Sequence, residues 1–222
     1  MPARARTRSA TARAKPVVAG LPADSFASYT GEALSEQALA DAARSLGCEL
    51  AAIKAVAEVE SRGSGFDSQG RPTVLYERHV FSRNCTPRGR FDSMPDISAP
   101  TGYGRGNYGT TESQWQKLAK AYALDPVAAL KAPSWGIFQV LGENHRACGF
   151  ATVTDFVRLM VTSQIGHLQV FVSFIKANPA LLKAIRALDW PSFARGYNGK
   201  DFAVFQYDQK MAAAYARHAA KR

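Results

Sequence analysis

Residues 48–66, Cys-Glu-Leu-Ala-Ala-Ile-Lys-Ala-Val-Ala-Glu-Val-Glu-Ser-Arg-Gly-Ser-Gly-Phe, decide how this chain folds. The first thirteen of them predict an amphipathic helix, because Leu50, Ile53 and Val56 recur at helical spacing and share one face. Glu60 falls on that same apolar face at the end of the helix. Desolvation and the negative end of the helix dipole both raise the pKa of a carboxyl group in such a position. A carboxyl group of this kind can act as a general acid.

The residues after Glu60 strengthen this hypothesis. For a lone glutamate, an exposed side chain at a frayed helix end is the ordinary interpretation. Here, however, the glycine-rich run Ser61-Arg62-Gly63-Ser64-Gly65 follows at once. Such a run turns the chain away from the helix and leaves space above the carboxyl group. We therefore expect a ligand to approach Glu60 from this side.

Length and composition predict one folded domain preceded by a basic tail. The chain has 222 residues, of which 46% are hydrophobic and 21% charged, and a net charge of +10. Five of the ten excess charges lie in residues 1–15, which contain no aromatic residue. We expect residues 1–30 to be a disordered tail and linker, and residues 31–222 to form the folded domain.

The charge distribution bears on possible partners. A basic surface attracts polyanions such as nucleic acid or an anionic cell envelope. A nucleic-acid-binding protein would concentrate its basic residues on one folded surface, with aromatic residues between them. Because half of the excess charge lies in the tail, we do not expect a nucleic-acid partner, and binding to nucleic acid is kept as a remote alternative. We expect the tail to attract the protein to an anionic envelope, an effect that salt would screen.

The cysteines and the N-terminus indicate synthesis in a reducing compartment. Cys48, Cys85 and Cys148 are an odd number without metal-ligand spacing, so we expect neither a disulfide framework nor a metal site. His145 and Cys148, three residues apart, could suggest a thiol hydrolase, but a buried structural cysteine is the better interpretation. Residues 1–30 lack the apolar segment of a secretory signal peptide.

Periodicity and cap residues predict a mainly helical fold. Ser35 and Gly47 have the positions of an N-cap and a C-cap for a first helix. Glycine and proline punctuate residues 61–109, which predicts a loop-rich insertion with a small β element near residues 73–81. The other predictions are helices from Thr111, over 153–177 and over 202–219, a compact apolar segment over 134–141, and a turn-rich segment over 190–199.

Four motifs in one order resemble the phage-type N-acetylmuramidase (endolysin) domain of the lysozyme-like superfamily. They are Val-Glu-Ser-Arg-Gly-Ser-Gly-Phe at 59–66, Glu-Arg-His-Val-Phe at 77–81, Ser-Trp-Gly-Ile-Phe-Gln-Val at 134–140 and Ala-Arg-Gly-Tyr-Asn-Gly at 194–199. Lytic transglycosylases and goose-type lysozymes share parts of this pattern. The resemblance implies a mainly α (α+β) lysozyme-like domain, with the loop-rich or small β insertion after the catalytic helix.

The resemblance also implies an activity and the residues that perform it. The expected reaction is cleavage of the β-1,4 bond between N-acetylmuramic acid and N-acetylglucosamine in peptidoglycan, without a cofactor or metal. Glu60 would be the general acid, Ser61 would bind near the lactyl or N-acetyl group, and Gln139 and Tyr197 would line the cleft. Asn198 would hold the backbone of the cleft. As alternatives, Ser61 and the pair Tyr197-Asn198 could be turn residues only.

The second catalytic group is left open by the sequence. Hydrolysis of a glycoside usually needs a second carboxylate opposite the acid. Glu77 is our first candidate, with an ion pair to Arg78 or another basic side chain as the alternative. Asp67, Asp92 and Asp96 are further candidates in loops. A lytic transglycosylase needs no second carboxylate, because the muramoyl 6-hydroxyl attacks in place of water, so this reaction is the main alternative.

These expectations together predict a monomeric endolysin that acts on peptidoglycan glycan strands. By the resemblance, it would be made in the cytoplasm of an infected bacterium without a signal peptide. It would reach the periplasm when another protein permeabilises the inner membrane.

Overall fold

The computed structural model describes residues 30–60, 65–104 and 107–221. It is mainly helical with one small sheet, as the sequence predicts. The predicted basic tail, apart from Thr30, lies outside the described residues. The elements in chain order are α1 (Glu36–Leu46), α2 (Leu50–Glu60), β1 (Val74–Tyr76), α3 (Arg78–Asn84), α4 (Thr111–Leu124), α5 (Pro126–Lys131), β2 (Pro133–Trp135), β3 (Val140–Leu141), the 3-10 helix η2 (Gly142–His145), α6 (Val153–Met160), α7 (Gln164–Lys176), α8 (Pro179–Arg186), α9 (Trp190–Asn198) and α10 (Tyr207–Ala219).

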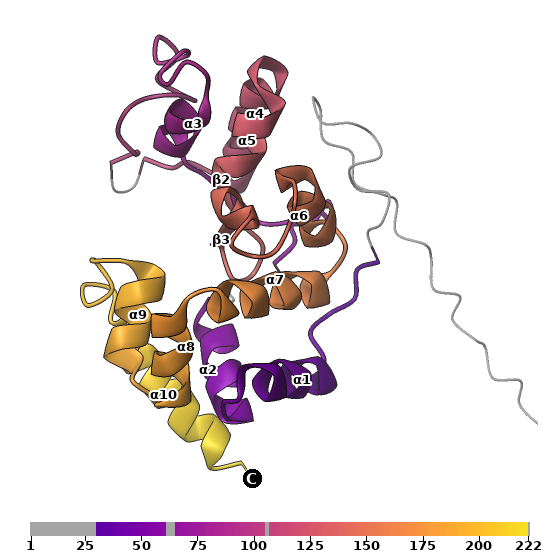
Figure 1. The fold of residues 1–222 in the computed structure, drawn as a ribbon, viewed down its shortest axis with the longest axis vertical. Coiled ribbons are helices and arrows are strands. Elements are labelled where there is room, and N and C mark those ends of the chain that lie inside the picture. Colours follow the sequence, from indigo (N-terminus) through magenta and orange to yellow (C-terminus); the bar gives the residue numbers. More distant parts are fainter. Residues whose placement is uncertain (1–29, 61–64, 105–106, 222) are drawn as a thin grey trace, which may run out of the picture.

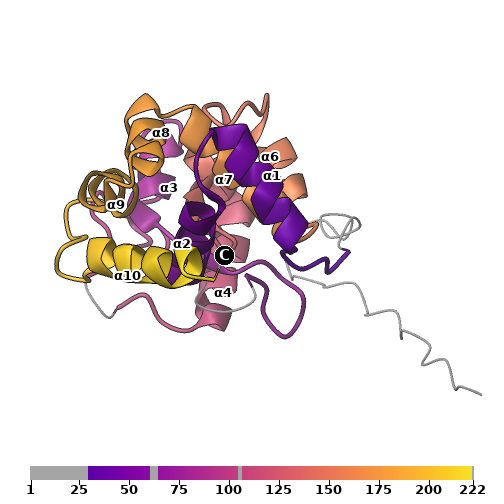
Figure 2. The same cartoon turned by 90° about the horizontal axis from the view of Figure 1, so that it is seen from below.

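The elements gather into an upper and a lower part (Figure 1). Helices α3, α4 and α5 and the sheet form the upper part, while α1, α2, α8, α9 and α10 form the lower part, with α7 between them. The last helix, α10, packs along α2, although the two are far apart in the sequence (Figure 2). The chain thus returns at its end to the helix that carries Glu60.

Helix α2 is more deeply buried than one apolar face would make it. Beyond the predicted Ile53, Val56 and Ala57, the side chains of Ala51, Ala52 and Ala55 are also buried. Small side chains let neighbouring helices approach α2 closely on several sides, so alternating apolar and polar faces are not needed here. The helix is therefore a central core helix.

Ion pairs tie α2 to the two neighbouring helices α1 and α10. Glu58 does not pair within its own helix; it accepts hydrogen bonds from Arg217 and His218 of α10, the latter at 2.8 Å. Lys54 pairs with Glu36 of α1. These contacts fix the rotation of α2 and with it the direction of Glu60.

The predicted β element is a three-stranded antiparallel sheet in the order β1-β2-β3. Val74 lies opposite Trp135, and Trp135 lies opposite Val140 across the hairpin that joins β2 to β3. Trp135 is fully buried, and its indole N–H donates to the carbonyl of Leu130 at 3.2 Å. The apolar segment 134–141 is therefore a hairpin anchored by one tryptophan.

The predicted helix over 153–177 is wrong as a single helix. The structure ends α6 at Met160 and starts α7 at Gln164, because Ser163 is an N-cap whose hydroxyl accepts the N–H of Gly166 at 3.1 Å. The polar pair Thr162-Ser163 is a cap signal that the apolar run obscured. In the described part of the chain no single helix is long and apolar enough to cross a membrane; α7 and α8 reach that limit only as a pair bent by 104°.

Two other elements also differ from the prediction. The segment 190–199, predicted to be turn-rich, contains helix α9, whose N-cap Asp189 accepts the N–H of Ser192 at 3.1 Å. The final helix begins at Tyr207, five residues after the predicted Phe202. Helix α4 begins at Thr111, as predicted, with Thr110 as its N-cap. Helix ends are set by local capping bonds that periodicity does not detect.

Buried His167 joins α7 to the hairpin and to α6. Its side chain is fully buried; Nδ1 accepts the N–H of Ile137 at 3.2 Å, and Nε2–H donates to the carbonyl of Met160 at 2.7 Å. These partners require the neutral ring, with its proton on Nε2. Burial lowers the pKa of His167 to about 4.

We predict that His167 makes the fold acid-sensitive. The unfolded chain takes up a proton near pH 6.5 and the folded protein only near pH 4, so the unfolded state holds the extra proton between these values. The free energy of unfolding should be highest above pH 6.5 and should fall by roughly 3 kcal/mol on going to pH 4. Chemical denaturation at several pH values measures this; His167→Gln should be less stable at pH 7 and should lose less stability on acidification.

Candidate active site

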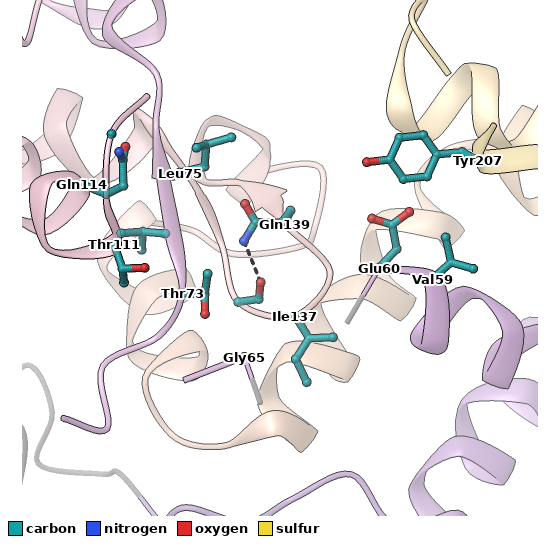
Figure 3. A pocket seen from close by; sticks show the side chains of 13 residues that line it. Val59, Glu60, Gly65, Thr73, Leu75, Thr111, Gln114, Ile137, Gln139 and Tyr207 are labelled. Carbon is teal, nitrogen blue, oxygen red and sulfur yellow. Dashed lines mark hydrogen bonds between the residues drawn. The ribbon is translucent and has the colours of Figure 1, made fainter. Parts of the chain in front are cut away.

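A cleft of about 360 Å³ lies between the end of α2 and the sheet. Val59, Glu60 and Tyr207 lie on one side of it, and Gln139, Thr73, Leu75, Thr111 and Gln114 lie opposite (Figure 3). The end of α2 and the start of α10, which are far apart in the sequence, therefore meet here. A concave site of this size, with an apolar lining and a few polar groups, is typical of a small-ligand site.

Glu60 is the last residue of α2 and lines the cleft, as the sequence predicted for a ligand-facing acid. The side-chain amide of Asn198 donates to Oε1 of Glu60 at 2.9 Å. Asn198 is the last residue of α9, so a second helix end holds the carboxyl group in place. The structure thus gives Asn198 a direct contact with Glu60, while its predicted binding of substrate stays a prediction.

Tyr197 lies behind the cleft. Its ring stacks on Phe193 at 5.5 Å between centroids and meets Phe171 and Phe174 edge-on. Its hydroxyl donates to the carbonyl of Phe138 at 2.5 Å, and burial raises its pKa well above the usual value. Tyr197 is not among the described residues that line the cleft, so the structure shows it as a support for the hairpin turn.

Gln139 lines the cleft from that same hairpin turn. It has a positive φ of 48°, uncommon for a residue other than glycine. Its side-chain amide donates to the carbonyl of Gly136 at 2.7 Å, and Gly136 itself has a φ of 72°. A Cβ on Gly136 would come within 2.6 Å of Met160, so only glycine fits there. The turn places Gln139 where the sequence predicted it, at the cleft wall.

Glu77 lies beyond the cleft lining, after β1. It has extended backbone angles and N-caps α3 without a side-chain capping bond. The hydroxyl of Tyr108 donates to both of its oxygens, at 3.0 and 3.2 Å. Burial raises the pKa of Glu77, and Tyr108, Arg83 and Lys117 offset part of that rise.

Neither Arg78 nor His79, the two basic residues that follow Glu77, forms a hydrogen bond with its carboxylate. The Arg78 guanidinium donates to the carbonyls of Thr101, Pro95 and Gly102, so the expected alternative of an ion pair with Arg78 is not what the structure shows. His79 Nδ1 is 3.3 Å from the Glu77 carboxylate, but the angles do not make a hydrogen bond. The predicted role of Glu77 as second carboxylate stays a prediction, as does that of Ser61, which lies outside the described residues.

Comparison with known proteins identifies the family. The family model described as Muramidase, N-acetylmuramidase, matches residues 49–219. This chain belongs to the N-acetylmuramidase family. It is similar to the crystal structure of the Burkholderia AP3 phage endolysin, with 37% sequence identity, a TM-score of 0.80, and coverage of 85% of this chain and 72% of that one. No curated protein matches.

Membership makes the chain a peptidoglycan-cleaving enzyme. The three aspartates considered as alternatives to Glu77 for the second carboxylate each pair with another side chain. Asp67 pairs with buried Arg71 at 2.7 Å, Asp92 accepts from Ser98 at 2.6 Å, and Asp96 pairs with Lys120 at 2.6 Å. In the described ranges no group of three or more histidine, cysteine, aspartate or glutamate residues could hold a metal ion.

The muramidase has three free thiols. Burial raises the pKa of Cys48, Cys85 and Cys148 to about 11. Nucleophilic cysteine chemistry depends on the thiolate, which such values disfavour. His145 is hydrogen-bonded within its own turn, to the carbonyl of Gly142. The pair considered as a thiol hydrolase is therefore structural, as the sequence analysis favoured.

Two cleft residues of the muramidase were missed from the sequence. Tyr207, which falls in the helix predicted over 202–219, lines the cleft across from Gln139. Gln114 also lines the cleft, and its side-chain carbonyl accepts the N–H of Tyr76 at 3.1 Å. Gln206, directly before Tyr207, has a left-handed backbone conformation. Nothing in the sequence signals that conformation, so the place of Tyr207 at the cleft could not be predicted from it.

We predict that Asn198 is needed for catalysis more than for folding. Asn198→Ala removes the hydrogen bond that orients Glu60, and an ordinary hydrogen bond is worth about 0.5–1.5 kcal/mol, or about two- to tenfold in kcat. Turbidity clearing of purified peptidoglycan measures the rate. As a control, Asn178→Ala removes a hydrogen bond to the carbonyl of Phe174; neither residue is among the described residues that line the cleft. Equal losses of kcat in both variants would contradict the prediction.

Proposed function

We propose that this muramidase hydrolyses the β-1,4 bond between N-acetylmuramic acid and N-acetylglucosamine, with Glu60 as the general acid. One observation carries the proposal: Glu60 is the only carboxylate among the described residues that line the cleft, and Asn198 fixes it there. A single oriented acid in a cleft matches a reaction that begins with proton transfer to a leaving oxygen.

The reaction would proceed in two parts. Protonated Glu60 gives its proton to the glycosidic oxygen while the bond from the muramoyl C1 to that oxygen breaks. The electron pair leaves with the oxygen, and positive charge develops on the sugar ring. Water then adds to C1, its proton is taken up by a carboxylate, and a reducing muramic end is formed.

Glu77 is the carboxylate we propose for this second part. Alternate residues of a strand point to the same side, and Thr73 and Leu75 of the β1 segment line the cleft. Glu77 continues this row with extended backbone angles. Its partner Tyr108 directly precedes Gly109, another lining residue. On this alternation Glu77 would extend the β1 wall beyond the residues that line the cleft.

Transglycosylation is the second candidate reaction, and the same lining favours it. A reaction in which the muramoyl 6-hydroxyl attacks C1 needs only one carboxylate, and only Glu60 lines the cleft among the described residues. The products of this reaction carry 1,6-anhydromuramic ends.

We predict that Glu60→Gln lowers peptidoglycan cleavage by at least a thousandfold, because an amide cannot donate the proton while its shape is kept. Mass spectrometry of wild-type digests should show reducing muramic ends. Anhydromuramic ends in these digests would show that the reaction is transglycosylation and not hydrolysis. Full activity in Glu60→Gln would remove Glu60 from both mechanisms. Glu32→Gln, at an exposed glutamate before α1, is the matched control.

We also predict that Tyr108 tunes the pH dependence through Glu77. Tyr108→Phe removes the hydrogen bond that lowers the pKa of Glu77, so this pKa should rise further. If ionised Glu77 takes up the proton from water, the acid limb of the kcat profile should move to higher pH. Tyr103→Phe is the control, because its hydroxyl bonds the carbonyl of Asp96. Identical profiles in wild type and Tyr108→Phe would exclude Glu77 from the mechanism.

We propose further that the enzyme serves as an endolysin that is made inside an infected bacterium and meets peptidoglycan after the inner membrane is permeabilised. The likeness to the AP3 phage endolysin supports this. Added protein should clear permeabilised Gram-negative cells and leave intact ones; lysis of both to the same extent would contradict it.

A further inference from the structure

The segment between α9 and α10 presents Tyr207 to the cleft. Tyr207 is the first residue of α10, and its N–H donates to the carbonyl of Phe202 at 3.1 Å, closing the loop. Phe202 is buried and anchors the other end of this loop. In Figure 3 the Tyr207 side chain projects from α10 above Glu60, with its hydroxyl directed toward the open cleft. An aromatic side chain therefore stands next to the acid.

The backbone before Tyr207 is in an unfavourable conformation. Gln206 has φ 56° and ψ 37°, the left-handed region that side chains other than glycine rarely adopt. Its side chain makes no capping bond at the start of α10. Of the described non-glycine residues, only Gln139, Leu188 and Gln206 have positive φ, and Gln139 lies in the opposite wall of the cleft. Strain of this kind persists where the surrounding fold imposes it and often marks a functional position.

The chemistry of the cleft gives Tyr207 a specific part. It is the only aromatic residue among the described residues that line the cleft; the other polar ones are Glu60, threonines and glutamines. A sugar ring presents C–H groups on its faces and hydroxyls at its edge. A tyrosine complements both, through its apolar ring and its polar tip. The ammonium group of Lys210, one turn further along α10, lies 5.7 Å from the ring centroid.

We propose that Tyr207 binds the glycan directly, with its ring against a sugar beside the bond that Glu60 protonates. Gln206 is the residue that positions it. This inference rests on the proposed function, since it takes a glycan as the ligand. It assigns the α10 side of the cleft to substrate recognition, apart from the proton transfer.

Binding to an inactive enzyme tests the proposal without catalysis. The parent is the Glu60→Gln protein, and the probe is the tetrasaccharide of alternating N-acetylglucosamine and N-acetylmuramic acid, measured by calorimetry. Adding Tyr207→Ala should raise the Kd at least tenfold. Adding Tyr207→Phe should raise it by no more than about threefold, since the ring is kept. Val204→Ala, a change at an exposed residue of the same loop, should have no effect. Thermal unfolding should be the same for all four proteins.

Two changes at Gln206 test its positioning role. Gln206→Gly fits the left-handed conformation and should keep the parent affinity, whereas Gln206→Val, whose branched side chain resists it, should weaken binding severalfold. A parent that does not bind the tetrasaccharide, or a Tyr207→Ala variant that binds as the parent does, would overturn the inference. Loss of activity in Glu60→Gln together with unaltered binding in Tyr207→Ala would leave the proposed function standing and remove this inference alone.

Discussion

Burial of α2 on several sides is the constraint on which the site depends. Ile53 and Val56 are fully buried, and burying each contributes about 1.5–3 kcal/mol. The buried alanines of α2 let α1 and α10 lie close, and the Glu58 contacts with α10 fix the helix rotation. Glu60 comes one turn after the last of these buried side chains. Its direction is therefore set by core packing, with Asn198 adding the final restraint.

The opposite wall is held by hydrogen bonds between side chains and the backbone of its turn. His167 receives the N–H of Ile137, Tyr197 donates to the carbonyl of Phe138, and Gln139 donates to Gly136. Three side chains thus satisfy polar groups of a four-residue turn, which keeps an unusual backbone in place. The residues that resemble family motifs here act largely as supports, and the cleft chemistry depends on the rigidity they give.

The sequence predicted the elements whose signals are local. Glu60 at a helix end, the caps Ser35 and Gly47, and the fold class follow from periodicity, capping and motif order. The division of 153–177 into two helices was missed because both halves are apolar and only the capping bond of Ser163 separates them. The place of Tyr207 was missed for a different reason. A tyrosine at helical spacing with Met211 has the same pattern whether it points to the core or to a cleft, and only tertiary packing distinguishes these.

Helix α10 both packs along α2 and supplies Tyr207 to one wall of the cleft. The core and the site therefore depend on the same helix. While the ribosome is still making residues 207–219, the nascent chain has neither the complete core around α2 nor the wall that bears Tyr207. Domains fold as units once their last packing element has emerged. Residues 207–219 therefore complete the packing around the acid helix and one wall of the cleft together, and a chain without them would have no assembled site.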